Sequence, residues 1–421
     1  MHADGSAAGS SVVGVLVIGA SHAGVALAGA LRAEGYDRPI TLVGAEDVVP
    51  YQRPPLTKDY LAGGAAADAL ALRPDDFYAD NDIALLTGTR VTEVDHTRRA
   101  AVVGDRTLHY DTLALTVGAR PRRLTVPGSA SPRVLHLRDL ADADRLAAAL
   151  GRAGHVLVVG GGYIGLEAAG VVTSLGRQVT VVEDDERLLP RSASPAISQF
   201  LLDAHRRRGV RVVLGRRVTA IADPGPGPVE ALLDDGSTID ADVVVVGIGA
   251  VPRVELATRL GLAVNRGIVV DALARTSDST IVAAGDCTVF AHPSRPGLVA
   301  GLESVQNATD QARTAAATIV GADRPYDAVP WFWSDQADLK LQMAGSANGS
   351  DLQILRGDPE LERFSVVHFR DGRLAAVESV NRPADYMACR RVLATGGSFD
   401  LARVAEYDVP LKNLAVPAGP T

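Results

Sequence analysis

Two glycine-rich segments of the sequence have the spacing that binds the phosphates of a dinucleotide. In the clearer one, Gly160 permits a tight turn, Gly162 lets a pyrophosphate approach the backbone, and Gly165 lets a helix pack closely on a strand. Glu183 ends the next predicted strand, where its carboxylate would accept hydrogen bonds from an adenosine ribose and repel a 2′-phosphate. This segment therefore favours NADH over NADPH, and the nearby Arg187 leaves NADPH open as the alternative.

The earlier segment, at residues 19–24, is an imperfect copy of the same motif. It reads GASHAG, so Ser21 stands where the second glycine is usual, and we expect so small a residue to retain binding. The acid is displaced too. Glu46 is the candidate ribose ligand, and Asp47 is the alternative. Two copies of the motif predict two bound nucleotides.

Both segments lie in the context that such a motif requires. A β-branched apolar run at 12–18 precedes the first, and a predicted helix at 23–34 and a strand at 40–43 follow it. The runs at 155–159 and 178–182 enclose the second segment and its helix in the same way. The sequence therefore predicts two Rossmann-like units built on parallel strands.

Further apolar runs deliver glycines to a ligand-binding edge of these sheets. Two of them end at Gly118 and Gly249, and a third, at 280–284, leads into Gly285 and Asp286. A carboxylate after a late strand can bind the polyol chain of a flavin, so Asp286 indicates that one of the two nucleotides is FAD.

The pattern changes after Val329. Short alternating runs at 364–369 and 374–380 predict an antiparallel sheet, and a helix is predicted at 384–394. We expect a separate α+β domain there. The alternating prolines and glycines at 224–228 predict a surface loop between two strands.

Composition narrows the function. The 421 residues are 47% hydrophobic and 22% charged, as in folded multidomain proteins, and the net charge of −8 argues against nucleic-acid binding. The first ten residues have no basic signal region, and the run at 12–18 is too short to span a bilayer, so we expect a cytoplasmic protein with no membrane anchor.

Redox chemistry has to come from a bound cofactor. Cys287 and Cys389 are the only cysteines, which leaves no disulfide framework or cysteine metal cluster. Lys58, Lys340 and Lys412 are the only lysines among 42 Lys and Arg residues. At each position, either the compact ammonium charge of lysine is required or lysine occurs there by chance.

Seven motifs together resemble the FAD-dependent ferredoxin reductases of bacterial oxygenase systems. They run in order along almost the whole chain: PYQRPPLTK at 50–58, ALTVGARPR at 114–122, GGGYIGLE at 160–167, GIGAVP at 247–252, AAGDC at 283–287, ESVQNA at 303–308 and PWFWSDQ at 330–336. The chain departs from the family pattern at Ser21, at Ala45 and at 116–118. The resemblance implies a glutathione-reductase-like α/β fold with an FAD domain at 1–115 and 248–328, an inserted NAD domain at 116–247, and a C-terminal α+β domain at 329–421.

The resemblance also implies roles for individual residues. Lys58 would lie beside the flavin N5 edge and pair with Glu167, and Tyr163 would stack over the flavin until nicotinamide displaces it. Glu167 and Tyr163 are otherwise packing residues of a helix. The FAD site implied by motif and family comprises Gly19, Ser21, His22, Ala23, Gly24, Glu46, Arg53, Pro54, Lys58, Val91, Thr116, Gly118, Arg138, Gly285, Asp286, Val305 and Trp333. The other predicted cofactor-binding residues are Gly160, Gly162, Tyr163, Ile164, Gly165, Glu183 and Gly249, of which the three glycines of the second motif and Glu183 would bind the NAD.

The predicted reaction is hydride transfer from NADH to flavin, followed by single-electron transfer to a two-iron ferredoxin. Lys412, Arg313 and Arg382 are candidate docking residues, and Trp333 is either a docking or a core residue. A rubredoxin reductase, an NADH oxidase and a redox-sensing flavoprotein that binds partners remain as alternatives. The protein is expected to be a monomer or a homodimer.

Overall fold

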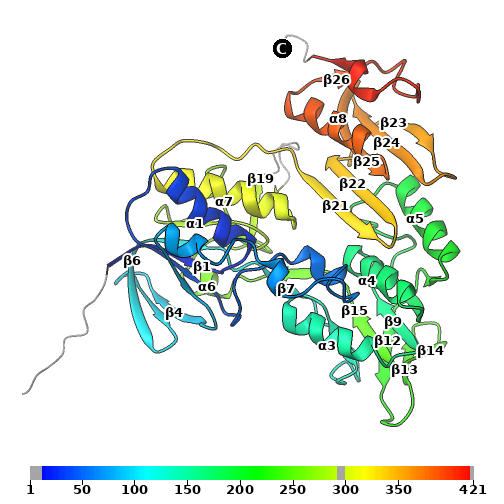
Figure 1. Cartoon of the computed structure of the whole chain (residues 1–421), viewed down its shortest axis with the longest axis horizontal. Coiled ribbons are helices and arrows are strands. Elements are labelled where there is room, and N and C mark those ends of the chain that lie inside the picture. Colours follow the sequence, from blue (N-terminus) through cyan, green and yellow to red (C-terminus); the bar gives the residue numbers. More distant parts are fainter. Residues whose placement is uncertain (1–11, 292–298, 418–421) are drawn as a thin grey trace, which may run out of the picture. The chain divides into compact units, whose positions relative to one another are not determined.

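Both predicted Rossmann-like units are present, and they belong to different parts of the molecule (Figure 1). The computed structural model describes residues 12–291 and 299–417. Contacts between residues group the chain into two compact units. The first unit contains Met1–Gln52, Ala71–Ala119 and Pro252–Ala328, and the second contains Arg53–Leu70, Arg120–Val251 and Val329–Thr421.

The sheet of the first unit is parallel around the first glycine-rich segment. Strand β1 (Val12–Ile18) pairs in parallel with β2 (Ile40–Val43) on one side and with β6 (Arg106–Leu115) on the other. The strand order is β3-β2-β1-β6-β5-β4, and β18 also pairs with β6. The remaining bounds are β3 Ile83–Leu86, β4 Val91–Asp95, β5 Ala100–Val103 and β18 Ile281–Ala283. The loop after β1 therefore lies where the strand order changes direction, which is where open α/β sheets bind ligands.

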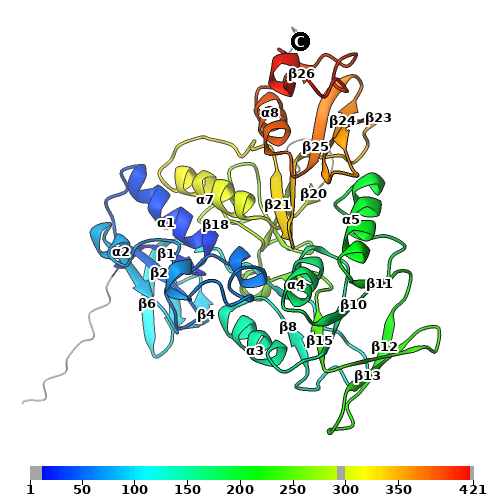
Figure 2. The ribbon, with the colours of Figure 1, turned by 45° about the vertical axis from the view of Figure 1, so that its right-hand side comes forward.

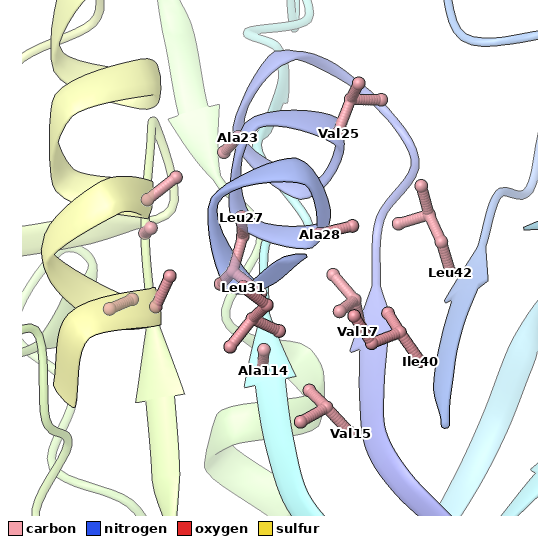
Figure 3. Packing of buried hydrophobic residues seen from close by; sticks show 14 of the residues in the cluster. Val15, Val17, Ala23, Val25, Leu27, Ala28, Leu31, Ile40, Leu42 and Ala114 are labelled. Atoms are coloured by element: carbon pink, nitrogen blue, oxygen red, sulfur yellow. The ribbon is translucent and has the colours of Figure 1, made fainter. Parts of the chain in front are cut away.

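Small side chains let two helices approach each other closely in this unit. Helix α1 (His22–Ala33) packs against α7 (Val305–Ile319), whose alanines share one buried cluster with Leu27 and Leu31. Figure 3 shows Leu27 and Leu31 of α1 near Val15 and Val17 of β1. The apolar face of α1 is thus fixed between the sheet and α7, which sets the direction of its N-terminus.

The second unit repeats this arrangement (Figure 2). Its parallel strands have the order β11-β10-β9-β15-β8, with α4 between β9 and β10 in the chain. The bounds are β8 Val134–His136, α3 Leu140–Leu150, β9 His155–Val159, α4 Tyr163–Ser174, β10 Gln178–Val182, α5 Pro195–Arg207, β11 Arg211–Val213 and β15 Val243–Val246. Strand β9 lies at the change of direction, as β1 does in the first unit.

The same unit contains the predicted antiparallel sheet. Its order is β21-β22-β25-β24-β23, with α8 (Pro383–Ala394) packed against it. The strands are β21 Trp331–Gln336, β22 Leu339–Gly345, β23 Leu352–Asp358, β24 Arg363–Arg370 and β25 Arg373–Val380. The predicted α+β C-terminal fold is therefore confirmed.

Most differences from the predicted elements are at their ends. The run expected to reach Gly118 ends as a strand at Leu115, and the hydroxyl of the next residue, Thr116, donates to Ile18 O and Gly19 O. The loop at 224–228 joins β12 (Val218–Ala222) and β13 (Val229–Leu233), as expected. No helix among the described residues is both long and apolar enough to cross a membrane.

Candidate functional site

The first glycine of each motif requires a left-handed backbone. Gly19 has φ +119° and Gly160 has φ +109°, a region that L side chains rarely adopt. A Cβ on Gly19 would lie 2.2 Å from Thr116 O, and one on Gly160 would lie 2.5 Å from Gly247 O. Both glycines are therefore needed for conformation and for close approach.

The third glycine of each motif lies directly against the first. A Cβ on Gly24 would lie 2.0 Å from Gly19 O, and a Cβ on Gly165 would lie 2.0 Å from Gly160 O. Each helix consequently begins pressed against its own loop. This close packing aims the helix N-terminus toward the edge of the sheet, as a phosphate site needs.

The middle position of the motif does not require glycine. Ser21 (φ −136°) and Gly162 (φ −82°) are the N-caps of α1 and α4, and both are in extended conformations that any residue can adopt. Neither helix receives a side-chain hydrogen bond from its N-cap. Donors in the first turn therefore suit a phosphate group. Each loop together with the start of its helix, at residues 19–24 and 160–165, is called a cradle below. The two cradles fit the nucleotides that the motifs predict.

Glu183 is placed to face the second cradle. It is 8% exposed, and it accepts a hydrogen bond of 2.5 Å from the Gly161 backbone N–H and one of 2.9 Å from the Asp185 N–H. Its oxygens retain further acceptor capacity for ribose hydroxyls. Arg187 instead donates to Ala193 O, Ser198 Oγ and Pro190 O, so its guanidinium holds the following loop together.

Glu46 has a different setting in the first unit. It lies beyond Gly44 and accepts a hydrogen bond of 2.5 Å from the Tyr51 hydroxyl. Asp47, the alternative, is exposed. Gly285 faces Ala23, since a Cβ on this glycine would lie 3.1 Å from the alanine Cβ. Two predicted FAD-contact positions are thus adjacent.

Lys58 and Glu167 form a largely buried ion pair in the second unit. Lys58 Nζ lies 2.7 Å from Glu167 Oε2, and the side chains are 16% and 3% exposed. Lys58 follows the short helix η1 (Pro54–Thr57), and Glu167 lies one turn after Tyr163 on α4. The Thr57 hydroxyl donates to Oε2, and the Ser334 hydroxyl donates to Oε1 at 2.7 Å. These donors offset the cost of burying a carboxylate.

Tyr163 packs against the C-terminal sheet of the same unit. Its ring centroid lies 4.5 Å from that of Phe332, and its hydroxyl lies 3.6 Å from Met343 Sδ. Burial raises the pKa of this phenol, and the charges of Glu378 and Glu167 raise it further. Tyr163 is therefore neutral in the physiological pH range, and its ring offers an uncharged aromatic surface.

Other predicted residues fall into both units. In the second, Arg53 donates to Arg138 O at 2.9 Å, and the Trp333 ring lies 5.7 Å from that of Trp331. Ile164 is 40% exposed at the start of α4. Of the remaining positions, Val91 begins β4, Val305 begins α7, His22 begins α1, Pro54 begins η1, Gly118 and Asp286 lie in loops of the first unit, and exposed Gly249 lies in the second.

Three residues of the site were not predicted. Thr57, Ser334 and Gln336 surround Glu167 or extend its hydrogen bonds. Two of them lie in the motif PWFWSDQ, where alternation along a strand gives Ser334 and Gln336 one face. That alternation was the available signal, but it does not reveal which helix the face meets.

Neither cysteine is suited to redox chemistry. Both are buried, Cys287 in the first unit and Cys389 in the second. Burial raises the pKa of the Cys287 thiol to about 12 and raises that of Cys389 as well. No group of three His, Cys, Asp or Glu side chains within 12–291 and 299–417 could hold a metal ion.

Two dinucleotide cradles, each at a change in strand order, are typical of an oxidoreductase that binds two nucleotides. The model of the family described as pyridine nucleotide-disulphide oxidoreductase matches residues 13–312, and a reductase C-terminal model matches 331–415. The chain belongs to the pyridine nucleotide-disulphide oxidoreductase family, whose members use FAD and a pyridine nucleotide.

Several relatives match over almost their full length. Rhodocoxin reductase of Rhodococcus erythropolis is 42% identical over 94% of this chain and 93% of its own. The crystal structure of the ferredoxin reductase for the CYP199A2 system from Rhodopseudomonas palustris matches with a TM-score of 0.92 and 40% identity, over 96% of this chain and 99% of that one. The reductase in a covalent putidaredoxin reductase–putidaredoxin complex matches with a TM-score of 0.91 and 38% identity, over 96% and 98%.

Proposed function

We propose that this chain is an FAD flavoprotein that oxidises NADH and passes electrons one at a time to a two-iron ferredoxin serving a monooxygenase or dioxygenase. The observation that carries the proposal is the combination of two dinucleotide cradles with two unreactive cysteines. Since no thiol pair can receive electrons, they have to pass to an acceptor outside the chain, either a carrier protein or oxygen. Relatives whose names include ferredoxin reductase support this choice of carrier.

FAD, when bound, supplies the chemistry, since it accepts a hydride and can release electrons singly. The residues of the chain bind and orient. The loop after β1 and the N-terminus of α1 would hold the FAD pyrophosphate, with Glu46 on its ribose. The loop after β9 would hold that of NADH, with Glu183 on the adenosine ribose.

Lys58, Glu167 and Tyr163 are proposed to act on the flavin ring. The Lys58 ammonium would stabilise negative charge near N5, and Glu167 would hold that ammonium in place through the 2.7 Å ion pair. Tyr163 would cover the ring until nicotinamide replaces it, which its neutral phenol permits. Arg53, Pro54 and Trp333 would border the ring.

An acidic ferredoxin would need a local basic surface, given the net charge of −8. Lys412 is exposed, and the Arg313 side chain is 64% exposed although it pairs with Asp310 at 2.7 Å, so both can be reached by a partner. Arg382 is less suitable, because it is 16% exposed, pairs with Asp385 and lies over the Tyr407 ring. Lys412 and Arg313 are therefore the docking candidates we retain.

The three-domain division is also a proposal. A separate C-terminal domain from residue 329 is supported by the match of the reductase C-terminal model, which begins at residue 331. We further propose that the protein works in the cytoplasm, where NADH is available. Fractionation of the native host would test that location.

Steady-state reduction of cytochrome c tests the function. The purified yellow protein is assayed with NADH and with NADPH, each with and without an added two-iron ferredoxin. We expect a strong preference for NADH and a rate that rises several-fold with ferredoxin. Rapid oxygen consumption with no effect of ferredoxin would instead identify an NADH oxidase, and stimulation by rubredoxin alone would identify a rubredoxin reductase.

A further inference from the structure

A chain of buried hydrogen bonds continues beyond the Lys58–Glu167 pair. Ser334 donates to Glu167 Oε1 at 2.7 Å, and Gln336 Nε2 donates to Ser334 Oγ at 3.2 Å. Gln336 Oε1 in turn lies 2.9 Å from His205 Nε2. Ser334 and Gln336 have no exposed surface, and His205 is 1% exposed. The chain thus links α4, β21 and α5 inside the second unit.

The donors and acceptors along this chain run in one direction. A glutamine oxygen can only accept, so His205 Nε2 carries the proton and donates to it. The amide then donates to the Ser334 hydroxyl, which is left free to donate to Glu167. Each group is oriented by the one before it. At the other carboxylate oxygen, Thr57 and Lys58 also donate, so every partner of Glu167 is a donor.

We propose that Ser334, Gln336 and His205 are positioning residues that keep the Glu167 carboxylate ionised and turned toward Lys58, and so set the reduction potential of the flavin. This inference rests on the proposed function, because the placement of a flavin beside Lys58 is part of that proposal. Glu167 is 3% exposed, so water cannot readily replace a hydrogen-bond donor that is removed. Removing one donor therefore favours its protonated form.

Protonation of Glu167 has a defined effect on the flavin. The neutral acid leaves the Lys58 charge unbalanced, and an extra positive charge stabilises the negative charge of reduced flavin. Two other titratable neighbours stay neutral, because burial raises the pKa of Tyr163 and lowers that of His205. Glu378, which also acts on Tyr163, accepts hydrogen bonds from Ser194 N and His368 and is outside this chain of bonds.

The test measures flavin reduction potential against pH in the FAD-loaded protein, between about pH 6 and 9. Ser334→Ala is expected to have a more positive potential than the parent at low pH and the same potential at high pH, so its curve gains an ionisation that the parent lacks. Gln336→Met should change the curve in the same direction but less, because the Ser334 hydroxyl remains. Ser334→Thr, which keeps the hydroxyl, should restore the parent curve.

Ser365→Ala is the matched control. Ser365 is also a fully buried serine of the same sheet, but its hydroxyl pairs with Ser379 and Asp385. It should lower thermal stability without changing the potential. A potential shift in this control equal to that of Ser334→Ala would overturn the proposal, as would a folded, FAD-loaded Ser334→Ala whose curve matches the parent or is displaced equally at every pH.

The potential is measured without any ferredoxin, so the two proposals fail separately. A protein that purifies without flavin contradicts the proposed function and this inference together. A flavoprotein whose rate ferredoxin does not change contradicts the ferredoxin assignment alone. A ferredoxin-dependent enzyme with identical potentials in all four variants contradicts this inference alone.

Discussion

The two glycine-rich loops share their backbone hydrogen bonds and close contacts, but a side chain that one loop carries on one residue of a facing pair is carried in the other loop on the partner residue. Gly19 N–H donates to Val43 O and Gly160 N–H donates to Val182 O, each at 2.8 Å. The third glycine of each motif touches the first in the same way. What differs is the pair formed by the residue after the first glycine and the residue after the second strand.

In the second unit the strand residue of this pair carries the side chain. Glu183 follows β10, and its neighbour in the loop is Gly161. The Glu183 carboxylate accepts a hydrogen bond from the Gly161 backbone N–H. In the first unit the loop residue is Ala20 and the strand residue is Gly44, where a Cβ would lie 2.9 Å from the alanine Cβ. Only one member of each pair has room for a side chain. A carboxylate for the first loop would therefore have to come from later in the chain, and Glu46 is the residue we propose.

The largest expected effects come from the contact that both loops share. Gly24→Ala and Gly165→Ala each place a Cβ 2.0 Å from a backbone oxygen, which costs about 3 kcal/mol or more of folding stability because the backbone has to shift. We expect Gly24→Ala to lose FAD. Gly165→Ala should keep its FAD and be reduced by dithionite but not by NADH. Flavin absorbance and stopped-flow reduction separate the two outcomes.

Gly151→Ala controls for the loss of a glycine at a helix end. Gly151 has φ −57°, and its added Cβ would meet nothing closer than an oxygen at 3.6 Å, so this variant should behave like the parent. If Gly165→Ala is reduced by NADH at the parent rate, the second loop does not hold the pyridine nucleotide, and the comparison between the loops loses its functional meaning.

The sequence predicted these loops well because the signal is local. Strands at 40–43 and 155–159 have the predicted bounds, since apolar β-branched runs between glycines leave few alternatives. The displaced acid Glu46 stays a candidate. The close approach of Ala20 to Gly44, which leaves no room for a side chain at residue 44, could not be predicted because it arises between segments that meet through the fold. The bonds from Ser334 to Glu167 were missed for the same reason, as 167 residues separate the partners.

Glu183→Gln should have the next largest effect. The amide removes the charge that would repel a 2′-phosphate and weakens acceptance from the Gly161 N–H, so discrimination in favour of NADH should fall roughly 10- to 100-fold. The measurement is kcat/KM for NADH and for NADPH. Glu46→Gln is the matched variant in the first unit, and it should weaken FAD retention while leaving the NADH to NADPH ratio unchanged. A change in that ratio for Glu46→Gln would reverse the assignment of the loops.

Exchanging the side chain within a pair should have a moderate effect. In Gly161→Ala the new Cβ would lie 2.6 Å from Leu188 Cδ2 and 3.1 Å from Glu183 Oε2, so stability should fall by about 1–3 kcal/mol. Ala20→Gly creates no clash and should cost about 1 kcal/mol or less. Thermal unfolding measures both. The double variant Gly161→Ala with Glu183→Gly should lose less than the sum of the two single losses, because it removes the 3.1 Å contact with Glu183 but not the 2.6 Å contact with Leu188. Losses that simply add would show that the two positions are not coupled.

The smallest effect is expected at the middle position of the motif, where the loops differ in sequence without differing in backbone. Gly162 has φ −82°, and a Cβ there would meet only Gly247 O at 3.7 Å, an ordinary contact. Gly162→Ser, which copies Ser21, should therefore change the KM for NADH less than about threefold, because neither strain nor a clash opposes it. Ser21→Gly should retain FAD equally well. A loss of NADH binding in Gly162→Ser would mean that the pyrophosphate approaches the second loop more closely than the first, and the tolerance of serine would then be a property of the FAD loop alone.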